Sequence, residues 1–170
     1  CYQQNMNWTI TFTDTGEDTN TGGRVKKIEK YIDSDIFLLT YGDGLANINI
    51  NELLDYHIKK GKLLTITCVR PRSQFGILKI DSENFVTEIQ EKPIMADWVN
   101  AGFFVCNKKI FNYLDNNCIL EREPIETLVK ERQVAAYKHE GFWQCMDTYK
   151  DKQLLDGLWN SGNSPWKLWE

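Results

Sequence analysis

The sequence predicts one α/β domain, a three-layer sandwich around a mixed, mostly parallel sheet. The chain has 170 residues, of which 42% are hydrophobic, and this is enough to bury a single core. Strand patterns alternate with helix patterns in the first half, which is typical of α/β packing. In the second half strand patterns cluster, so we expect a mixed sheet rather than a purely parallel one.

The first elements follow from hydrophobic spacing. Residues 8–12 (WTITF) alternate apolar and polar side chains and predict a strand. Residues 14–23 (DTGEDTNTGG) contain no apolar side chain and predict a polar loop. Val25, Ile28 and Ile32 then recur at helical spacing, so a short amphipathic helix should follow the loop.

A buried strand and a capped helix come next. Residues 36–41 (IFLLTY) form a largely apolar run, as in strands that are covered on both faces. Residues 50–61 (INELLDYHIKKG) predict a helix that ends at a glycine cap, Gly61. The side chains expected to face inward from this helix are Leu53, Leu54 and Ile58.

The second half should be richer in strands. Its strand patterns lie at 63–69, 75–80, 85–91, 100–107 and 134–138. Its helix patterns lie at 109–116, 121–132 and 149–162. Pro124 must lie near the start of the second of these helices, because proline is tolerated in the first turn. No internal repeat or linker divides the chain, so we expect residues 1–170 to form a single domain.

Composition argues against several function classes. The net charge of −4 comes without a long basic run, so we expect no nucleic-acid partner. No apolar run approaches the roughly 20 residues that a membrane-spanning helix needs. The first residues also lack the charged and apolar regions of a signal peptide. We therefore expect a cytoplasmic protein without a membrane partner.

The cysteine pattern fits a reducing compartment. The five cysteines are odd in number, and no two of them are spaced as CxxC. Cys68, Cys106 and Cys145 lie in apolar stretches, where a free thiol packs as a small core side chain. We expect structural thiols rather than a zinc site or a disulfide framework.

The segment YGDG (41–44) places a carboxylate, Asp43, between Gly42 and Gly44 directly after the buried strand. In α/β sheets the ligand crevice lies at the carboxyl ends of the strands. Flanking glycines let phosphates and a hydrated cation approach the main chain, and Mg²⁺ prefers one or two carboxylates plus phosphate oxygens. The alternative is an ordinary turn aspartate.

Two further segments place charged groups at strand ends. In GFWQCMDTYKD, Asp147 follows an aromatic stretch and precedes a predicted helix, where it could serve a metal or cap the helix. In QEKPI, Glu91 and Lys92 end a strand before a proline. Lys92 could neutralise a phosphate and Glu91 could accept hydrogen bonds from sugar hydroxyls, although an exposed strand end would look similar.

The polar loop offers another set of ligand groups. Its hydroxyls, the amides of Gly22 and Gly23, and Arg24 could hold a polar ligand, while Arg24 could equally be a surface helix residue. We expect His57 to be structural or solvated, and His139 to lie in a turn. Neither histidine has a serine or cysteine partner at a recognisable spacing, so nucleophilic catalysis lacks support.

Together these stretches resemble the sugar-phosphate nucleotidylyltransferases, and most closely the glucose-1-phosphate cytidylyltransferases. The matching segments span nearly the whole chain, and they are DTGEDTNTGGRVKKIEKYI, FLLTYGDGLANINI, FGILKI, FVTEIQEKP, NAGFFVCNKKI, EREPIETL, GFWQCMDTYKDK and LLDGLWNSGNSPWK. YGDG and EKP are shared across the wider superfamily. The DTG…TGGR stretch, GFWQxMDTxxDK and the terminal GxxPWK are more specific to the cytidylyl branch.

The resemblance implies a fold and a reaction. The fold is the Rossmann-like nucleotide-diphospho-sugar transferase sandwich. In the reaction CTP and α-D-glucose 1-phosphate give CDP-glucose and pyrophosphate with Mg²⁺ as cofactor, by in-line attack of the sugar-phosphate oxygen on the α-phosphorus. The protein then mainly positions two polyanions and stabilises charge, so no covalent nucleophile is expected.

The resemblance also assigns roles to residues of this chain. Asp43 and Asp147 match the Mg²⁺ ligands and form, with Lys92, the catalytic set. The residues that match nucleotide-, phosphate- or sugar-binding positions are Thr19, Arg24, Gly42, Glu91, Lys92 and Asn100.

Two departures from the family pattern accompany the match. The family begins with a glycine-rich GGxGTR loop that cradles the triphosphate, whereas this sequence starts at Cys1 and contains no such loop. We therefore expect the C-terminal two-thirds of a longer nucleotidylyltransferase, without the first strand and helix of the nucleotide fold. Cys145 stands where the family commonly carries proline, which could alter the approach to Asp147.

Functions of different classes stay open. The first is a Mg²⁺-dependent nucleotidylyltransferase that favours CTP, with a uridylyl- or thymidylyltransferase as the alternative because much of the base pocket would lie in the absent segment. The second is a catalytically incomplete sugar-phosphate-binding or assembly module. A metal-dependent glycosyltransferase is a third, opposed by the EKP segment and by the lack of a DxD motif.

Assembly is expected as well. Members of the family commonly form homo-oligomers, so we expect this chain to do so. The tryptophan-rich end of the chain could pack at such an interface or close the core, and its residues are Trp159, Trp166 and Trp169. The resemblance further implies a role in making precursors of dideoxy sugars or surface polysaccharides.

Overall fold

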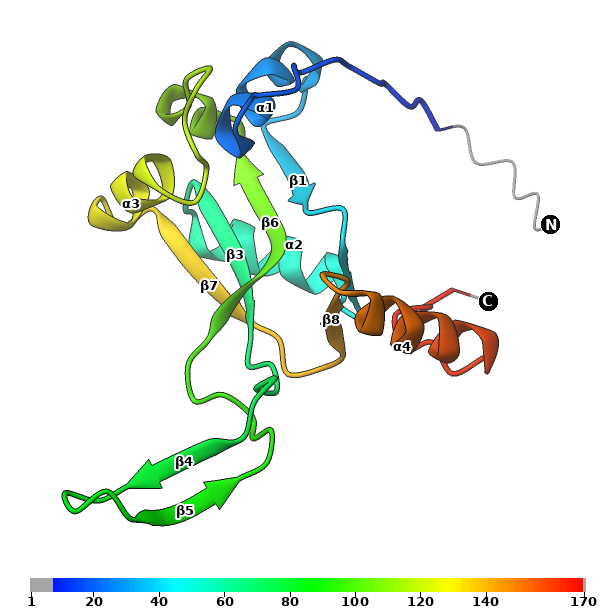
Figure 1. Ribbon diagram of the computed structural model, residues 1–170. Coiled ribbons are helices and arrows are strands. Elements are labelled where there is room, and N and C mark those ends of the chain that lie inside the picture. The colour runs from blue at the N-terminus through cyan, green and yellow to red at the C-terminus, as the bar shows by residue number, and fades with distance from the viewer. Residues whose placement is uncertain (1–7, 170) are drawn as a thin grey trace.

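A four-stranded sheet in the order β1-β6-β3-β7 lies at the centre of the structure, a computed structural model that describes residues 8–169 (Figure 1). Its strands are β1 (Ile36–Thr40), β3 (Leu64–Val69), β6 (Val99–Asn107) and β7 (Val134–Lys138). The strands β1, β3 and β7 run in one direction, and β6 runs against them between β1 and β3. The predicted mixed sheet is confirmed, and the single reversed strand makes its pairings with both neighbours antiparallel.

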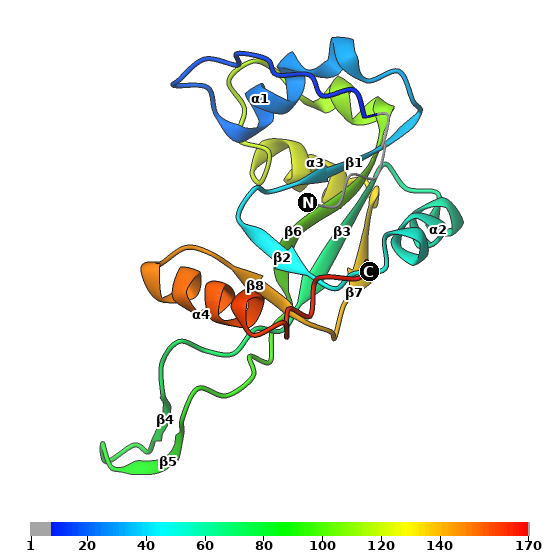
Figure 2. The same ribbon diagram turned by 90° about the vertical axis from the view of Figure 1, so that its right-hand side faces the viewer.

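Helices cover both faces of this sheet (Figure 2). The elements on one face are α1 (Thr21–Lys27) with the short 3₁₀ helix η1 (Glu29–Tyr31) after it, the 3₁₀ helix η2 (Lys108–Tyr113) and α3 (Glu123–Lys130). The element on the other face is α2 (Ile50–Lys60). The three-layer arrangement therefore agrees with the prediction.

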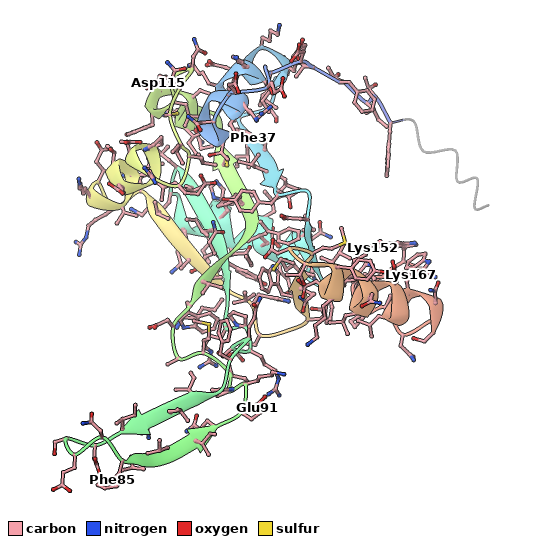
Figure 3. All side chains as sticks on the ribbon, viewed as in Figure 1. Phe37, Phe85, Glu91, Asp115, Lys152 and Lys167 are labelled. Atoms are coloured by element: carbon pink, nitrogen blue, oxygen red, sulfur yellow. The ribbon has the colours of Figure 1, made fainter. Side chains whose placement is uncertain are left out.

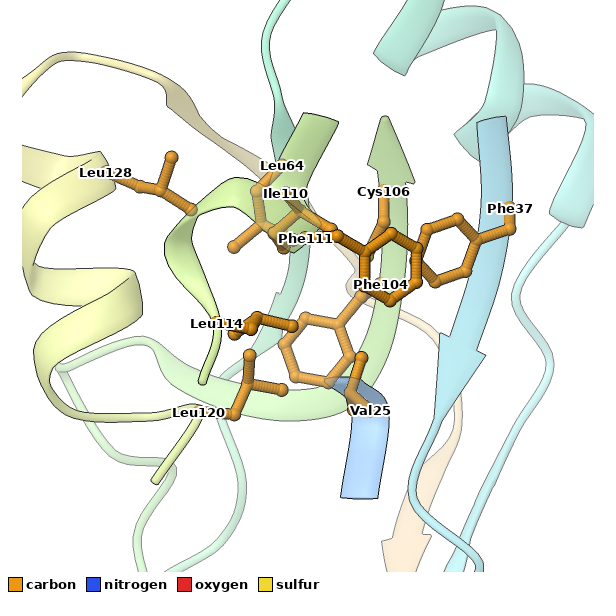
Figure 4. Packing of buried hydrophobic residues seen from close by; sticks show 10 residues of the cluster. All are labelled: Val25, Phe37, Leu64, Phe104, Cys106, Ile110, Phe111, Leu114, Leu120 and Leu128. Carbon is orange, nitrogen blue, oxygen red and sulfur yellow. The ribbon is translucent and has the colours of Figure 1, made fainter. Parts of the chain in front are cut away.

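The larger core cluster lies between the sheet and the layer of α1, η2 and α3 (Figure 4). Phe37 of β1 stacks on Phe111 of η2 with ring centroids 5.4 Å apart. Phe104 and Val105 are neighbours on β6, and both are almost fully buried. Because side chains alternate along a strand, Phe104 packs in the larger cluster and Val105 packs against Leu53 of α2.

Two smaller sheets flank the sandwich. β2 (Gly44–Ala46) pairs with β8 (Trp143–Cys145), and the helix α4 (Tyr149–Asn160) follows β8. β4 (Ile77–Ile80) and β5 (Val86–Gln90) form a hairpin that extends away from the sandwich (Figure 1). The strands β2 and β8 were not predicted, because three residues are too few to show an alternating pattern.

Residues 8–12 do not form the predicted strand. The structure gives them no regular secondary structure, and Trp8, Ile10 and Phe12 are exposed. An alternating segment becomes a strand only where a neighbouring strand takes up its backbone hydrogen bonds. Within residues 8–169 no strand pairs with this segment.

Burial differs from expectation in β1 and α2. Leu38 is 53% exposed, so the prediction that β1 is covered on both faces is wrong: β1 is an edge strand of the sheet. Ile58 of α2 is exposed although an inward position was predicted. His57 takes that inward position one turn after Leu53, and both are buried. The helix ends at its Gly61 cap, as predicted.

The remaining differences concern the type and length of helices. Residues 108–113 form a 3₁₀ helix, and the expected helix at 109–116 is limited to this stretch. α1 begins at Thr21, within the predicted loop, and Ile32 lies beyond its end. Pro124 lies in the first turn of α3, as predicted.

The described cysteines are free thiols, as expected. Cys68 and Cys106 are buried, whereas Cys118 and Cys145 are half-buried. Burial raises the pKa of Cys106 to about 12, so this side chain stays protonated as a core thiol. Cys1 lies outside the described residues. Among residues 8–169 no helix combines the length and the apolar character that a membrane crossing would require.

His57 should make stability depend on pH. Its imidazole is 2% exposed, its Nδ1 lies 2.8 Å from Oγ1 of Thr65, and burial lowers its pKa. The unfolded chain therefore binds a proton near pH 6.5 that the folded chain does not yet accept, and stability falls as the pH drops through that value. Urea unfolding at pH 7.5 and 5.5 should show this loss, and it should be smaller in His57→Gln. His139→Gln is the control and should lose as much stability as the wild type. If His57→Gln also loses as much stability as the wild type, the pH dependence does not come from His57.

Candidate active site

Asp43 lies in the turn that joins β1 to β2, at the carboxyl end of β1 as predicted. β2 pairs with β8 so that Gly44 faces Cys145, and the carbonyl oxygen of Asp43 accepts a hydrogen bond of 2.9 Å from the amide of Met146. The next residue after Met146 is Asp147. The pairing therefore brings the two predicted carboxylates to adjacent backbone segments, and both side chains are exposed.

Asp147 is not the cap of α4. Thr148 caps this helix, because its hydroxyl accepts a hydrogen bond from the amide of Asp151 while the Asp151 carboxylate accepts from the amide of Thr148. Asp147 Oδ2 instead lies 3.0 Å from the thiol of Cys145. Burial and this neighbouring carboxylate raise the pKa of Cys145 to about 12, so the thiol serves as a donor. The capping interpretation is thereby excluded, and the Asp147 carboxylate is not needed for the helix.

The two glycines beside Asp43 differ in their surroundings. A side chain at Gly42 would meet no atom within 4 Å, so the backbone there is open to a ligand. Gly44 lies in β2, and a Cβ added there would lie 3.5 Å from Cε2 of Phe103, at ordinary contact distance. Free access to the backbone is therefore a property of Gly42, and Gly44 serves the pairing of β2 with β8.

Asn100 is held beside this turn by β6. Its Oδ1 accepts a hydrogen bond of 2.9 Å from the amide of Gly102, and its Nδ2 donates to the hydroxyl of Tyr41 at 3.4 Å. Gly102 has a φ of 77°, and a Cβ there would lie 2.6 Å from Cδ2 of Tyr41. Only glycine lets the Tyr41 ring lie this close, and the ring also packs edge-on against Phe104.

A further carboxylate, Glu121, accepts a hydrogen bond from the Tyr41 hydroxyl. Tyr41 donates to Oε1 of Glu121, and the hydroxyl of Thr21 donates to Oε2 at 2.7 Å. Burial and the hydrogen bond to Glu121 raise the pKa of Tyr41 well above its usual range. Burial alone would raise the pKa of Glu121, but the hydrogen bonds from Tyr41, from Thr21 and from the backbone amide of Glu121 together outweigh it, and the net pKa is lowered. Glu121 is therefore an ionised acceptor that joins α1 to the end of β1.

Thr19 and Arg24 are engaged within the polar loop. The Arg24 guanidinium donates to the hydroxyl of Thr15 at 2.7 Å and to the carbonyl of Glu17 at 2.8 Å. The Thr19 hydroxyl donates to the carbonyl of Thr15 and accepts from Lys27. The hydrogen bonds that the structure gives these two side chains thus shape the loop, and the loop is connected to the Asp43 turn through Thr21 and Glu121.

Gly22 and Gly23 pack against protein rather than offering a ligand surface. Both are buried, and the amide of Gly23 donates to the carbonyl of Cys118 at 3.1 Å. A Cβ at Gly23 would lie 2.3 Å from the backbone oxygen of Asn116. The amide of Gly23 is therefore used within the protein rather than presented to a ligand, and the two glycines allow α1 to approach residues 116–120.

Gly23→Ala should lower the stability of the fold. The added methyl group meets backbone, which cannot rotate away, and overpacking of this kind costs about 1–3 kcal/mol. Gly157→Ala is the matched control, because it lies in α4 with nothing within 4 Å and should be neutral or slightly stabilising. Urea unfolding of the two variants gives the comparison, and equal stabilities would contradict this account of the TGGR segment.

Glu91 lies where the hairpin joins the rest of the molecule (Figure 3), and Lys92 is the next residue along the chain. They follow β5, as predicted, and Lys92 Nζ lies 3.5 Å from Oε1 of Glu91. The carbonyl of Lys92 lies 3.5 Å from Nη1 of Arg72, across the two strands of the hairpin base. Lys92 has a φ of 45°, which is unusual for a residue other than glycine.

A groove of about 790 Å³ lies between the hairpin base and β8. The residues that line it are 70–75, Ile94, Met95, 140–145 and Asp151. One lining residue, Cys145, contacts Asp147, and another, Arg72, contacts the backbone of Lys92. The groove therefore lies next to both predicted charged sites, although Asp43, Asp147, Glu91 and Lys92 are not among its lining residues. Its volume is in the range of small-molecule sites.

The sequence alone did not reveal every residue of this region. Nothing in the sequence around Glu121 and Tyr41 indicates the hydrogen bond between them. Trp143 fixes β8 against β6, because its Nε1 donates to the carbonyl of Ala101 at 2.9 Å. The only sequence signal for these residues is their place in EREPIETL, YGDG and GFWQ. His139 contacts the carbonyl of Phe142 at 3.2 Å, close to its own turn.

The chemistry of the Asp43–Asp147 pair fits a hard cation. Among residues 8–169 no group of three or more His, Cys, Asp or Glu side chains could hold a metal by itself. Mg²⁺ does not need such a group when substrate phosphates complete its shell, because one or two carboxylates are then sufficient. Asp43 and Asp147 provide two exposed carboxylates on adjacent backbone segments, and Asp147 does not cap α4. Their chemistry therefore fits this requirement.

The sequence profile of the nucleotidyl transferase family matches residues 2–153. The chain belongs to the nucleotidyl transferase family. A probable glucose-1-phosphate cytidylyltransferase of Bacillus subtilis is 44% identical to this nucleotidyl transferase over 164 residues, which are 95% of the chain and 64% of the relative. The glucose-1-phosphate cytidylyltransferase of Salmonella typhi is 43% identical over 167 residues, 96% of the chain and 64% of the relative.

The chain thus spans slightly less than two-thirds of the length of these curated relatives. Solved structures agree on the fold. HddC from Yersinia pseudotuberculosis superposes with a TM-score of 0.64 at 21% identity, covering 89% of this chain and 68% of that one. A putative glucose-1-phosphate thymidylyltransferase from Bacillus anthracis superposes with a TM-score of 0.62 at 16% identity, covering 84% and 62%. The nucleotidyl transferase fold predicted from the sequence is confirmed.

Proposed function

We propose that the protein transfers a cytidylyl group from CTP to α-D-glucose 1-phosphate, giving CDP-glucose and pyrophosphate. The observation that carries the proposal is the 43–44% identity to glucose-1-phosphate cytidylyltransferases over nearly the whole chain. The arrangement of the site supports it, because Asp43 and Asp147 lie on adjacent backbone segments and a groove of small-molecule size lies between β8 and the hairpin base. The chain described here corresponds to the metal- and sugar-phosphate-binding part of that enzyme.

Asp43 and Asp147 are the proposed ligands of Mg²⁺. When bound, the cation neutralises phosphate charge and so lowers the repulsion between the two anionic substrates. Gly42 leaves the backbone beside Asp43 open, which suits the approach of a nucleotide phosphate. The two aspartates act as fixed acceptors and exchange no proton with the substrates in this proposal.

The sugar phosphate is proposed to lie between the hairpin base and the Asp43 turn, next to the groove. Lys92 neutralises its phosphate, Glu91 accepts hydrogen bonds from sugar hydroxyls, and Asn100 contributes an amide close to the Asp43 turn. Thr19 and Arg24 reach the nucleotide or the sugar phosphate by exchanging their present contacts within the loop. The reaction needs orientation and charge neutralisation, and these residues supply both without a covalent intermediate.

A second candidate is a sugar-phosphate-binding module without turnover. Its sugar-phosphate contacts would be the proposed Glu91, Lys92 and Asn100, none of which requires turnover in order to bind. A uridylyl- or thymidylyltransferase is a third candidate within the same family. Binding of glucose 1-phosphate without pyrophosphate release would support the module, whereas release with UTP or dTTP would support the third candidate.

We also propose a cytoplasmic homo-oligomer. The four described cysteines are free thiols, the state that a reducing compartment maintains. At the end of the chain Trp159, Leu168 and Trp169 are exposed, while Trp166 packs on Phe142. Exposed large apolar side chains suit an interface between copies. Light scattering should give a multiple of the 19.9 kDa chain mass, and a monomer mass would reject the assembly.

Pyrophosphate release tests the proposed reaction. The assay contains Mg²⁺ and glucose 1-phosphate and offers CTP, UTP, dTTP and ATP separately, first to this chain and then to a version extended to the length of its relatives. Release with CTP alone is the expected result for the extended version. Release with another nucleotide would replace the base assignment, and no release with any of the four would reject the enzyme in favour of the module.

A further inference from the structure

We infer that Glu121 is a positioning residue that fixes the orientation of Tyr41 and, through it, of the Asn100 amide. The inference rests on the proposed function for the role of Asn100 and goes beyond it, since the proposed site does not include Glu121. It stands on three hydrogen bonds that meet beside the Asp43 turn: Tyr41 to Glu121, Thr21 to Glu121, and Asn100 to Tyr41.

The hydroxyls of Thr21 and Tyr41 both donate to Glu121, and the other hydrogen bond of each hydroxyl fixes the direction of its proton. The Thr21 oxygen accepts a hydrogen bond of 3.0 Å from the amide of Leu120, so its own proton is free to point at Glu121. The Tyr41 oxygen accepts from Asn100, so its proton likewise points at Glu121. An ionised carboxylate can satisfy two such donors, because it has an acceptor oxygen for each and no proton of its own. The lowered pKa of Glu121 agrees with this state.

The same chain of bonds determines which way the Asn100 amide points. Its Oδ1 is committed to the amide of Gly102, which can only donate. Its NH₂ group must therefore face the Tyr41 oxygen, and that oxygen can accept because its proton is committed to Glu121. Glu121 thus acts on Asn100 without touching it, and the free N–H of the Asn100 amide is left in a defined direction.

The location of this hydrogen-bond network indicates a role beyond linking α1 to the end of β1. Glu121 and Asn100 are both exposed, so the network lies at a surface that a ligand can reach rather than in the core. It joins three segments that are separate in the sequence: the polar loop, the YGDG turn and the NAG segment of β6. Each of these segments carries a residue of the proposed site. One carboxylate therefore sets the relative position of groups that must meet one substrate.

Glu121→Gln is the most informative variant. Glutamine has the same shape, but it presents one oxygen and one NH₂ group to two committed donors. If its NH₂ faces Tyr41, the tyrosine proton must turn toward Asn100, where it meets an N–H. Tyr41→Phe is the second variant, because it removes the hydroxyl and keeps the ring that packs on Gly102. Glu126→Gln, an exposed residue on α3, is the matched control.

The first measurement is the pair of Asn100 side-chain amide signals in ¹H–¹⁵N NMR spectra of the 170-residue chain. We expect these signals to shift in Glu121→Gln and in Tyr41→Phe and to stay in place in Glu126→Gln. The backbone spectra show whether each variant is folded. Asn100 signals that stay unchanged in both folded variants, Glu121→Gln and Tyr41→Phe, would overturn the inference, because a purely structural link between α1 and β1 would not act on Asn100.

The second measurement is steady-state kinetics in the extended version of the chain. Loss of an oriented hydrogen-bonding group should raise KM for glucose 1-phosphate about tenfold in Glu121→Gln, with kcat changed far less. An unchanged KM would overturn the part of the inference that concerns substrate. If the wild-type protein releases no pyrophosphate at all, the proposed function fails, while the amide signals still decide whether Glu121 positions Asn100.

Discussion

Asp43→Asn should reduce Mg²⁺-dependent pyrophosphate release by more than about a hundredfold in a version of the chain extended to the length of its relatives. The amide keeps the size of the side chain but loses its charge and one of its acceptor oxygens. A hard cation binds such a group poorly, so the phosphates of both substrates would lose a shared neutralising partner. Asp147→Asn should have an effect of the same kind, since the pairing of β2 with β8 brings it beside Asp43.

The matched control is Asp55→Asn, an exposed aspartate on α2. It removes the same charge from the molecule at a distance from the turn, so its rate should stay near that of the wild type. Raising the Mg²⁺ concentration should partly restore Asp43→Asn if the defect is weaker metal binding. A rate close to the wild-type rate in Asp43→Asn would return this residue to the role of an ordinary turn aspartate.

The position of Asp43 was accessible from sequence because two strong local signals coincide there. A run of apolar residues predicts the strand, and the flanking glycines mark its end. The long strands of the main sheet and the capped helix α2 were predictable for the same reason, with boundaries shifted by a few residues. A hydrophobic pattern over five or more residues shows which face of a strand or helix is buried. The strands of the main sheet and the helices that cover it all bury one face in this way.

The contacts that assemble the candidate site were not accessible in this way. β2 and β8 are three residues long and meet across about a hundred residues of chain, so neither has a periodic pattern. Tyr41 and Glu121 are 80 positions apart, and nothing local to either residue indicates the other. At Asp147 the sequence left metal binding and helix capping equally open, because Thr148 beside it is also a good cap. The structure decides against capping through the reciprocal bonds of Thr148 and Asp151.

Lys92→Ala should weaken the handling of glucose 1-phosphate more than that of CTP. A charge-assisted contact to phosphate is worth about 1.5–3 kcal/mol, which corresponds to a rise in KM for the sugar phosphate of roughly 10- to 100-fold. Lys79→Ala is the matched control, because Lys79 is an exposed lysine on the same hairpin that pairs with Glu88. Kinetics with each substrate varied in turn separate the two KM values. An unchanged KM for glucose 1-phosphate would remove Lys92 from the proposed site.

The backbone of Lys92 permits a sharper version of this experiment. Its φ of 45° lies in the left-handed region, where a residue other than glycine is strained. Lys92→Gly should relieve that strain, so the chain should become as stable as the wild type or more stable, by up to about 1 kcal/mol. The same variant should still show the raised KM, since it lacks the ammonium group. A protein that gains stability and loses affinity through one substitution would indicate that the lysine is present for its charge rather than for the fold. Loss of stability together with an unchanged KM would indicate the opposite.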